Sequence, residues 1–185
     1  MTMNVAHIEK QSYIYGPGCR FVIWTQGCSI RCEGCWNQSM WDFTGGHEIA
    51  VSDILDQIIA MGAKIDGITL LGGEPLDQYE EVLLLLQLCA KTGLSTMLFT
   101  GYELWEVEEN GMSDMLRYLD ILITGRYKES ERTLRHQWIG SINQGVYFLT
   151  SRYSEKDMVN GNYMEITVAE DGSLTVLGFP PEQLT

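Results

Sequence analysis

Short apolar runs and helix-spaced apolar residues alternate along the first two thirds of the sequence. The apolar runs are typical of buried strands, which we predict over residues 5–8, 19–25, 67–71, 95–100 and 121–123. Between them, apolar residues recur three and four positions apart, which predicts helices over residues 52–61, 79–89 and 114–119. Ser52 and Gly62 give the first helix a start and a stop signal. Strands that alternate with helices in this way indicate parallel βαβ units.

The last third of the chain has a different pattern. One strand is predicted over residues 145–149, and two more over 164–168 and 173–177 flank an Asp-Gly pair that favours a hairpin turn. A closed eight-fold (β/α) barrel takes about 250 residues, and this chain has 185. The expected fold is therefore α/β: an open, partial (β/α) barrel of mostly parallel strands with a C-terminal β-hairpin, in a single domain over residues 1–185.

Composition places the chain among ordinary water-soluble globular proteins, with 45% hydrophobic and 20% charged residues. No apolar run is long enough to cross a membrane, and no basic-then-apolar segment opens the sequence. Free cysteines without an export signal suit a reducing cytoplasm, which is the expected location. The formal net charge of −13 argues against nucleic-acid binding, which needs a basic face. This charge either keeps the protein soluble or matches a basic partner.

Three cysteines, Cys28, Cys32 and Cys35, lie within eight residues in the spacing C-x-x-x-C-x-x-C, directly after a predicted strand. Thiolates this close in sequence can converge on one soft metal centre. A [4Fe–4S] cluster held by only three cysteines keeps one iron open to a substrate. A structural zinc site needs a fourth ligand, for which only Cys19 and His47 are near, and five cysteines are an odd number for a disulfide framework.

The cysteine spacing resembles the cluster loop of the radical S-adenosylmethionine (SAM) superfamily. The superfamily usually has an aromatic residue before the third cysteine. Residues 34–37 (Gly-Cys-Trp-Asn) instead resemble the branch that activates anaerobic ribonucleotide reductase, which has Gly-Cys-aromatic-Asn. Residues 140–144 resemble the Gly-Ser-x-Asn-Gln signature of the same branch, while Ile139 and Thr124 stand where that branch tends to have Arg and Asp.

This resemblance implies an enzyme with a [4Fe–4S] cluster and SAM as cofactors. The cluster ligands would be Cys28, Cys32 and Cys35, and the reduced cluster would cleave SAM to methionine and a 5′-deoxyadenosyl radical. The radical would abstract hydrogen from a glycine of a partner enzyme such as anaerobic ribonucleotide reductase. A flavodoxin- or ferredoxin-type protein would be the reductant, and neither nucleic acid nor membrane would take part.

Residues 72–75 (Gly-Gly-Glu-Pro) follow a predicted strand and resemble the SAM-binding strand end of the superfamily. Because glycine exposes the main chain to the methionyl ammonium of SAM, a bulky residue at Gly73 is expected to weaken SAM binding and spare the cluster. Glu74 either anchors that ammonium or braces the loop. The residues expected near the cofactors are Gly72, Gly73, Glu74, Trp36, Asn37, Thr100, Tyr102 and Arg126.

Several of these residues have a simpler structural interpretation. Trp36 is expected beside the cluster and Tyr102 beside the adenosyl group, but both can be packed aromatics. Arg126 is expected at the SAM carboxylate, but it can form a surface salt bridge. Two other functions also remain open: radical modification of another peptide or small molecule, and a non-catalytic iron–sulfur or zinc binding module. Reductive SAM cleavage would separate the module from the two enzymes.

Overall fold

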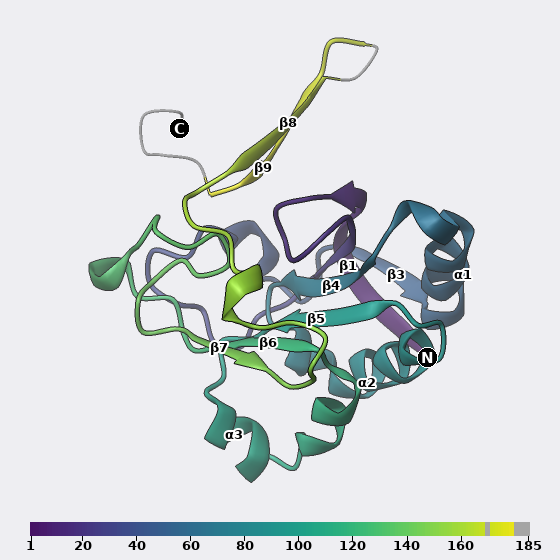
Figure 1. Cartoon of the computed structure of the whole chain (residues 1–185), viewed down its shortest axis with the longest axis horizontal. Helices are drawn as coiled ribbons and strands as arrows, with labels where there is room; N and C mark the ends of the chain where they lie inside the picture. Colours follow the sequence, from purple (N-terminus) through teal and green to yellow (C-terminus); the bar gives the residue numbers. More distant parts are fainter. Residues whose placement is uncertain (169–170, 180–185) are drawn as a thin grey trace.

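The structure is a computed structural model that describes residues 1–168 and 171–179. It contains a seven-stranded sheet in the order β3-β1-β2-β4-β5-β6-β7 and a separate hairpin, β8–β9 (Figure 1). The strands are β1 (Thr2–Ser12), β2 (Arg20–Thr25), β3 (His47–Ala50), β4 (Gly67–Gly72), β5 (Ser95–Phe99), β6 (Ile121–Thr124), β7 (Gly145–Phe148), β8 (Met164–Val168) and β9 (Leu174–Gly178). The α-helices are α1 (Val51–Met61), α2 (Tyr79–Ala90) and α3 (Leu104–Glu109). Among the described residues, no helix is long and apolar enough to span a membrane.

The centre of the sheet consists of four parallel strands, β2, β4, β5 and β6. Every residue of β2 is buried, as expected for a strand covered on both faces. Thr25 pairs with Gly72, so the carboxyl ends of β2 and β4 lie level with each other. The edges are antiparallel: β1 and β3 extend one side, and β7 closes the other. This confirms the expected partial barrel with mostly parallel strands and a C-terminal hairpin.

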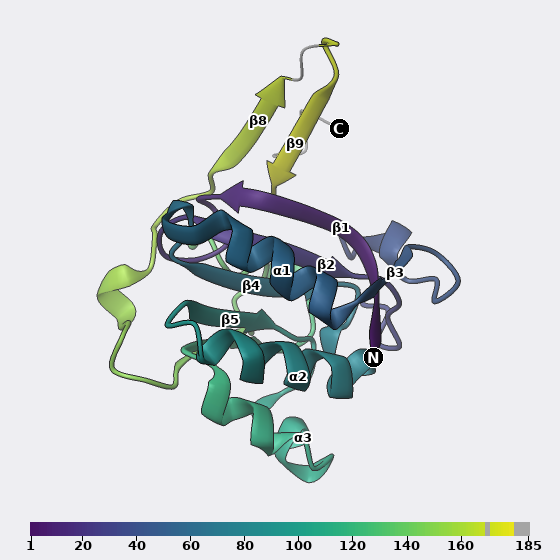
Figure 2. The ribbon, with the colours of Figure 1, turned by 90° about the vertical axis from the view of Figure 1, so that its right-hand side faces the viewer.

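Helices α1 and α2 cover one face of the sheet (Figure 2). Ile54 and Ile58 of α1 and Leu85 and Leu86 of α2 are fully buried, and they share one apolar core with alternate residues of the central strands. A second apolar cluster, formed by Val22, Trp24 and Leu71, lies on the opposite face of the sheet. These residues alternate along their strands with those that face the helices. Loops rather than helices cover this second face, and we expect the functional site among these loops.

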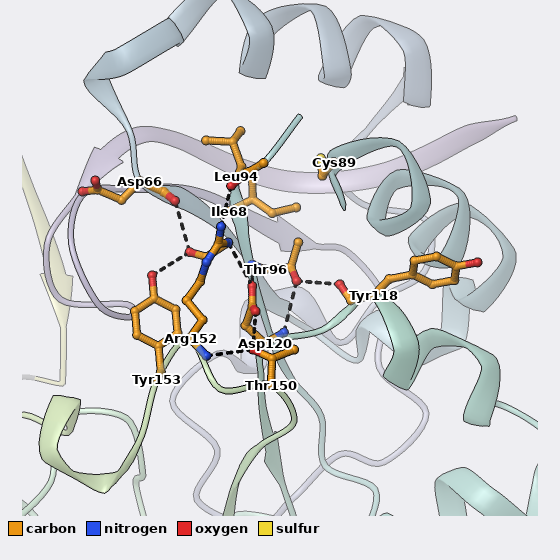
Figure 3. A network of polar contacts seen from close by, with 12 residues as sticks. Asp66, Ile68, Cys89, Leu94, Thr96, Tyr118, Asp120, Thr150, Arg152 and Tyr153 are labelled. Carbon is orange, nitrogen blue, oxygen red and sulfur yellow. Dashed lines mark hydrogen bonds and ion pairs between the residues drawn. The ribbon is translucent and has the colours of Figure 1, made fainter. Parts of the chain in front are cut away.

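A buried polar network closes the amino ends of the central strands. Arg20 is fully buried, and its guanidinium donates to Thr69 Oγ1, to the Ile68 carbonyl and to Ser95 Oγ. Burial lowers the pKa of Arg20 to about 10. Nearby, the carboxylate of Asp120 accepts from three groups on two segments, as Figure 3 shows: Thr96 N of β5, and Thr150 Oγ1 and Arg152 Nη1 of the loop after β7. These bonds tie the later part of the chain to the sheet and leave the carboxyl ends of the strands for chemistry.

Some helices and strands differ from those predicted from the sequence. Strand β1 is longer than expected and β3 was not predicted, because their exposed positions interrupt the apolar pattern. Ser52 does not cap α1, which begins one residue earlier and has no side-chain cap. The segment predicted as a helix over 114–119 is a 3₁₀ helix, Ser113–Tyr118. Helix α3 was missed, although Glu103 and Glu106 form a reciprocal capping box at its start.

Candidate functional site

The cysteine loop, residues 26–37, leaves the carboxyl end of β2 and is anchored by backbone hydrogen bonds. Gly27 N donates to the Met40 carbonyl at 2.9 Å, and Cys28 N donates to the Trp41 carbonyl at 3.2 Å. The loop turns sharply at Arg31, a non-glycine residue with φ of +51°. A conformation of this kind is costly for a residue with a Cβ, so the surrounding structure must hold it.

The three thiols of this loop lie in different surroundings. Cys28 is buried, and its sulfur accepts a hydrogen bond from Arg31 N at 3.5 Å. Cys32 and Cys35 are half-buried neighbours, and Cys35 N donates to the Cys32 carbonyl at 3.1 Å. Burial raises the pKa of Cys28 and of Cys32, while backbone N–H groups, including that of Tyr127 at Cys32, oppose the shift.

This donor set fits an iron–sulfur cluster in its chemistry. One loop supplies three soft sulfur ligands, and backbone N–H groups point at two of the sulfurs, as they do where thiolates are held. Over residues 1–168 and 171–179, however, no three Cys, His, Asp or Glu side chains gather closely enough to hold a metal ion. The assignment of Cys28, Cys32 and Cys35 as joint ligands therefore stays a prediction.

The glycine loop, residues 72–74, packs directly on the cysteine loop. Gly73 N donates to the Thr25 carbonyl and Glu74 N to the Gly27 carbonyl, both at 2.8 Å. Asn37 Nδ2 also donates to the Gly72 carbonyl at 3.4 Å. The two loops thus form one hydrogen-bonded unit at the carboxyl ends of adjacent parallel strands.

The reason for glycine at position 73 differs from the one that the sequence suggested. A Cβ there would lie 2.1 Å from the Gly27 carbonyl oxygen and 2.9 Å from the Met40 carbonyl oxygen. Both are backbone atoms of the cysteine loop and its anchor, so they cannot move aside cheaply. A larger residue at Gly73 is therefore expected to disturb the cysteine loop itself, so cluster content is expected to fall together with SAM binding.

Glu74 braces the site from inside. Its carboxylate is buried and accepts three hydrogen bonds, from Leu76 N at 2.9 Å, Thr100 Oγ1 at 2.8 Å and Gly101 N at 2.8 Å. Burial raises the pKa of Glu74 to about 7, although the three donors oppose this shift. Because these bonds join the ends of β4 and β5, the bracing role holds in this structure for both Glu74 and Thr100. A contact of either residue with SAM stays a prediction.

The two remaining candidates on this side of the site are held by protein groups. The Arg126 guanidinium donates to both carboxylate oxygens of Glu106, at 2.5 and 2.9 Å, which is the salt bridge foreseen as the simpler alternative. Tyr102 lies beside it, with 5.9 Å between the guanidinium carbon and the ring centre. Glu106 is only partly exposed and would have to release Arg126 before that residue could meet a carboxylate of SAM.

The signature at residues 140–144 shapes a neighbouring loop. The Gln144 side chain accepts from Gly140 N at 2.8 Å and donates to the Gly125 carbonyl at 3.0 Å. Asn143 Nδ2 donates to the Arg126 carbonyl at 2.9 Å. Asn143 and Gln144 therefore hold the backbone that follows β6 in place.

A cavity of about 210 Å³ opens beside these loops on the face of the sheet away from α1 and α2. Trp24, Leu71 and Phe99 from three parallel strands line it, together with Cys35 and Trp36 of the cysteine loop. Apolar side chains thus form the wall on the side of the sheet, while Asn37 and Gln144 are among the polar residues of the lining. The cysteine loop and the apolar face of the sheet therefore line one open cavity.

Four residues of the cavity wall were not foreseen: Tyr15, His136, Trp138 and Phe179. Trp36, which was foreseen, is 42% exposed, so it is not plain core packing, and its ring centre lies 5.1 Å from that of Phe179. Trp138 Nε1 and His136 Nδ1 are buried without a hydrogen-bond partner among the described residues, and both side chains line the cavity. Tyr15 lines it as well. Their positions depend on loops whose conformation no periodic pattern in the sequence reports.

Residues 14–147 match the family described as the 4Fe-4S single cluster domain. The chain belongs to this family, and with it to the radical SAM proteins that its cysteine spacing resembled. Its relatives include the anaerobic ribonucleoside-triphosphate reductase-activating proteins of Enterobacteria phage T4 and of Vibrio cholerae. The first is 32% identical over 78% of this chain and 94% of that protein, and the second is 33% identical over 80% and 99%.

Two further comparisons cover a smaller part of this chain. The pyruvate formate-lyase 1-activating enzyme of Escherichia coli K12 is 39% identical over 53% of this chain and 42% of that protein. The crystal structure of QueE from Escherichia coli is 21% identical, with a TM-score of 0.44 over 55% of this chain and 53% of that chain. So weak a structural likeness adds nothing to the assignment.

Proposed function

We propose that this protein is a radical SAM activase that abstracts a hydrogen atom from a glycine Cα of a glycyl-radical enzyme. The observation that carries the proposal is the unit formed by the cysteine and glycine loops, joined by the bonds Gly73 N to Thr25 O and Glu74 N to Gly27 O. A site for a cluster and a site for SAM at adjacent strand ends would hold the two cofactors side by side. The named activities of the relatives support the choice of partner.

The residues of the chain have distinct parts in this proposal. Cys28, Cys32 and Cys35 would hold a [4Fe–4S] cluster with one iron open, and the main chain of the glycine loop would bind the methionine end of SAM. When bound and reduced, the cluster supplies one electron to a C–S bond of SAM, which yields methionine and a 5′-deoxyadenosyl radical. The electron comes from a one-electron donor of the flavodoxin or ferredoxin type.

The remaining steps belong to the protein and its partner. Glu74 keeps the ends of β4 and β5 in register, and Trp24, Leu71 and Phe99 would give the radical an apolar wall on the side of the sheet. A 5′-deoxyadenosyl radical held there would take one hydrogen atom from the glycine Cα, which would give 5′-deoxyadenosine and leave one unpaired electron on the glycine Cα. This carbon is a good hydrogen donor because its radical is delocalised over both flanking amides.

The proposal is tested by combining the reduced, reconstituted protein with SAM and the anaerobic ribonucleotide reductase of the same genome. A glycyl doublet in the EPR spectrum, together with 5′-deoxyadenosine, is expected. If SAM is cleaved but every glycyl-radical enzyme of that genome stays silent, the substrate is another peptide or a small molecule. If SAM is not cleaved at all, the protein is a metal-binding module.

A further inference from the structure

The hairpin β8–β9 stands out from the rest of the protein in both views (Figures 1 and 2). At its base, Ser12 Oγ donates to Glu165 Oε2 at 2.5 Å, Tyr13 N donates to Glu165 Oε1 at 2.6 Å, and Gly178 N donates to Tyr15 Oη at 2.9 Å. The family match ends at residue 147, so the hairpin lies beyond the part of the chain that this match explains.

One face of this hairpin is apolar and exposed to solvent. Ile166 pairs with Val176, and Val168 pairs with Leu174, so all four side chains lie on the same face. Their exposed fractions are 60% and 50% for the first pair and 66% and 65% for the second. A two-stranded ribbon is only marginally stable by itself, and a contiguous exposed apolar surface marks an interaction site. The apolar face of the hairpin is therefore expected to be covered by another surface.

The hairpin rises from the rim of the cavity. Gly178 ends β9, Phe179 follows it, and both line the cavity together with Cys35 and Trp36. The Phe179 ring lies 5.1 Å from the Trp36 ring and carries the guanidinium carbon of Arg132 at 4.7 Å on its face. A protein that inserts a peptide segment into this cavity would therefore lie next to the hairpin.

Charge favours a different protein over a second copy of this chain. Among the described residues of the hairpin, Asp171 is an exposed acid and none is lysine or arginine; Glu165 lies on the other face and is bonded to Ser12 and Tyr13. The whole chain has a formal net charge of −13. Two copies would bring like charges together, whereas an apolar patch bordered by basic side chains would be attracted.

We propose that the apolar face of β8–β9 (Ile166, Val168, Leu174 and Val176) is the docking surface for the protein that receives the radical. That protein would present an apolar patch bordered by lysine or arginine. The inference rests on the proposed function and adds the surface through which the activase holds its partner over the cavity.

The test uses the full chain, reconstituted with its cluster, and the anaerobic ribonucleotide reductase of the same genome. The double variant Ile166→Thr/Val176→Thr removes apolar surface but keeps a β-branched cross-strand pair, so the hairpin is retained. The matched control, Thr167→Ser/Thr175→Ser, alters the pair on the opposite face. The double variant should bind the reductase roughly tenfold or more weakly, while the control binds like wild type.

The same variants separate docking from chemistry. Iron and sulfide content and SAM cleavage without a partner should match wild type in the double variant. Its glycyl-radical yield should fall at low reductase concentration and recover at high concentration. Unchanged affinity and yield overturn the docking surface and leave the proposed function standing. Failure of the wild-type protein to form a glycyl radical on any candidate overturns both.

Two further measurements on the wild-type protein test the docking surface even if the double variant fails to fold. Amide hydrogen exchange in the wild-type protein should slow across β8 and β9 when the reductase binds, and an unchanged rate overturns the proposal even if the variant misfolds. Sedimentation of the wild-type chain alone should show a monomer at micromolar concentration. If the wild type is a dimer, the double variant is a monomer and its affinity for the reductase is unchanged, the surface binds a second copy of the chain. That result overturns the inference.

Discussion

Replacing Gly73 with alanine tests whether the glycine loop supports the cysteine loop. The backbone of Gly73 is not in the left-handed region, so alanine adds no backbone strain and the whole effect comes from its Cβ. That atom would lie 2.1 Å from the Gly27 carbonyl oxygen, and ordinary contact begins at 3.4 Å. The two loops would therefore have to separate by about 1.3 Å.

A separation of this size breaks specific bonds. The hydrogen bonds from Gly73 N and Glu74 N are both 2.8 Å long, and stretching either by that amount ends it. At about 1 kcal/mol for each of the two bonds, with a further cost of about 1–2 kcal/mol for overpacking, the free energy of unfolding should fall by roughly 3–4 kcal/mol. Because the same movement displaces the residue before Cys28, cluster content should fall as well.

Urea unfolding of the apoprotein measures the first effect, and iron and sulfide analysis after anaerobic reconstitution measures the second. Gly62→Ala is the control, since no atom lies within 4 Å of its added Cβ and its cost comes from the backbone alone, with φ of +53° and ψ of −132°. It should cost about 1–3 kcal/mol and leave the cluster content unchanged. If Gly73→Ala unfolds like wild type and holds a full cluster, the reasoning about the two loops is refuted.

Three other results are expected. Alanine at any one of the three loop cysteines should abolish the cluster in iron and sulfide assays, whereas Cys89→Ala, which removes a buried thiol of α2, should retain it. Glu74→Gln should lower the free energy of unfolding of the apoprotein at pH 8 by about 1–3 kcal/mol, because an amide nitrogen would face the Gly101 N–H or another donor. The pKa of Glu74 is raised from its ordinary 4.5 to about 7, so the folded state binds more protons between these values. Stability should then fall as pH rises through this window, and the slope should shrink in Glu74→Gln; a flat wild-type curve would contradict this.

The sequence was most informative where chemistry or periodicity constrains single residues. The cysteine spacing and the Gly-Gly-Glu-Pro run pointed to two loops, and the structure joins these loops by hydrogen bonds at adjacent strand ends. The buried strands were visible because strands covered on both faces are continuous apolar runs, as β2 shows. The Asp-Gly pair indicated the hairpin, because such a pair favours the turn between two antiparallel strands.

Features that depend on contacts between distant segments were not visible. Gly73 was explained by an incoming ligand, but the atoms that exclude a Cβ belong to Gly27 and Met40, far away in sequence. The salt bridge of Arg126 with Glu106 required knowing that α3 forms, and an acidic run gave no sign of that helix. Phe179 could not be assigned to the cavity, because only the path of the hairpin brings it to Trp36.

The transfer of deuterium from partner to cofactor tests the central claim most directly. A glycyl-radical enzyme whose glycine residues carry deuterium at Cα would be incubated with the reduced protein and SAM. If the radical abstracts hydrogen from the glycine Cα, deuterium should appear in the 5′-deoxyadenosine that forms. The EPR doublet that the remaining α-hydrogen otherwise produces should also collapse. Unlabelled 5′-deoxyadenosine from a reaction that cleaves SAM at full rate would contradict hydrogen abstraction from the partner's glycine.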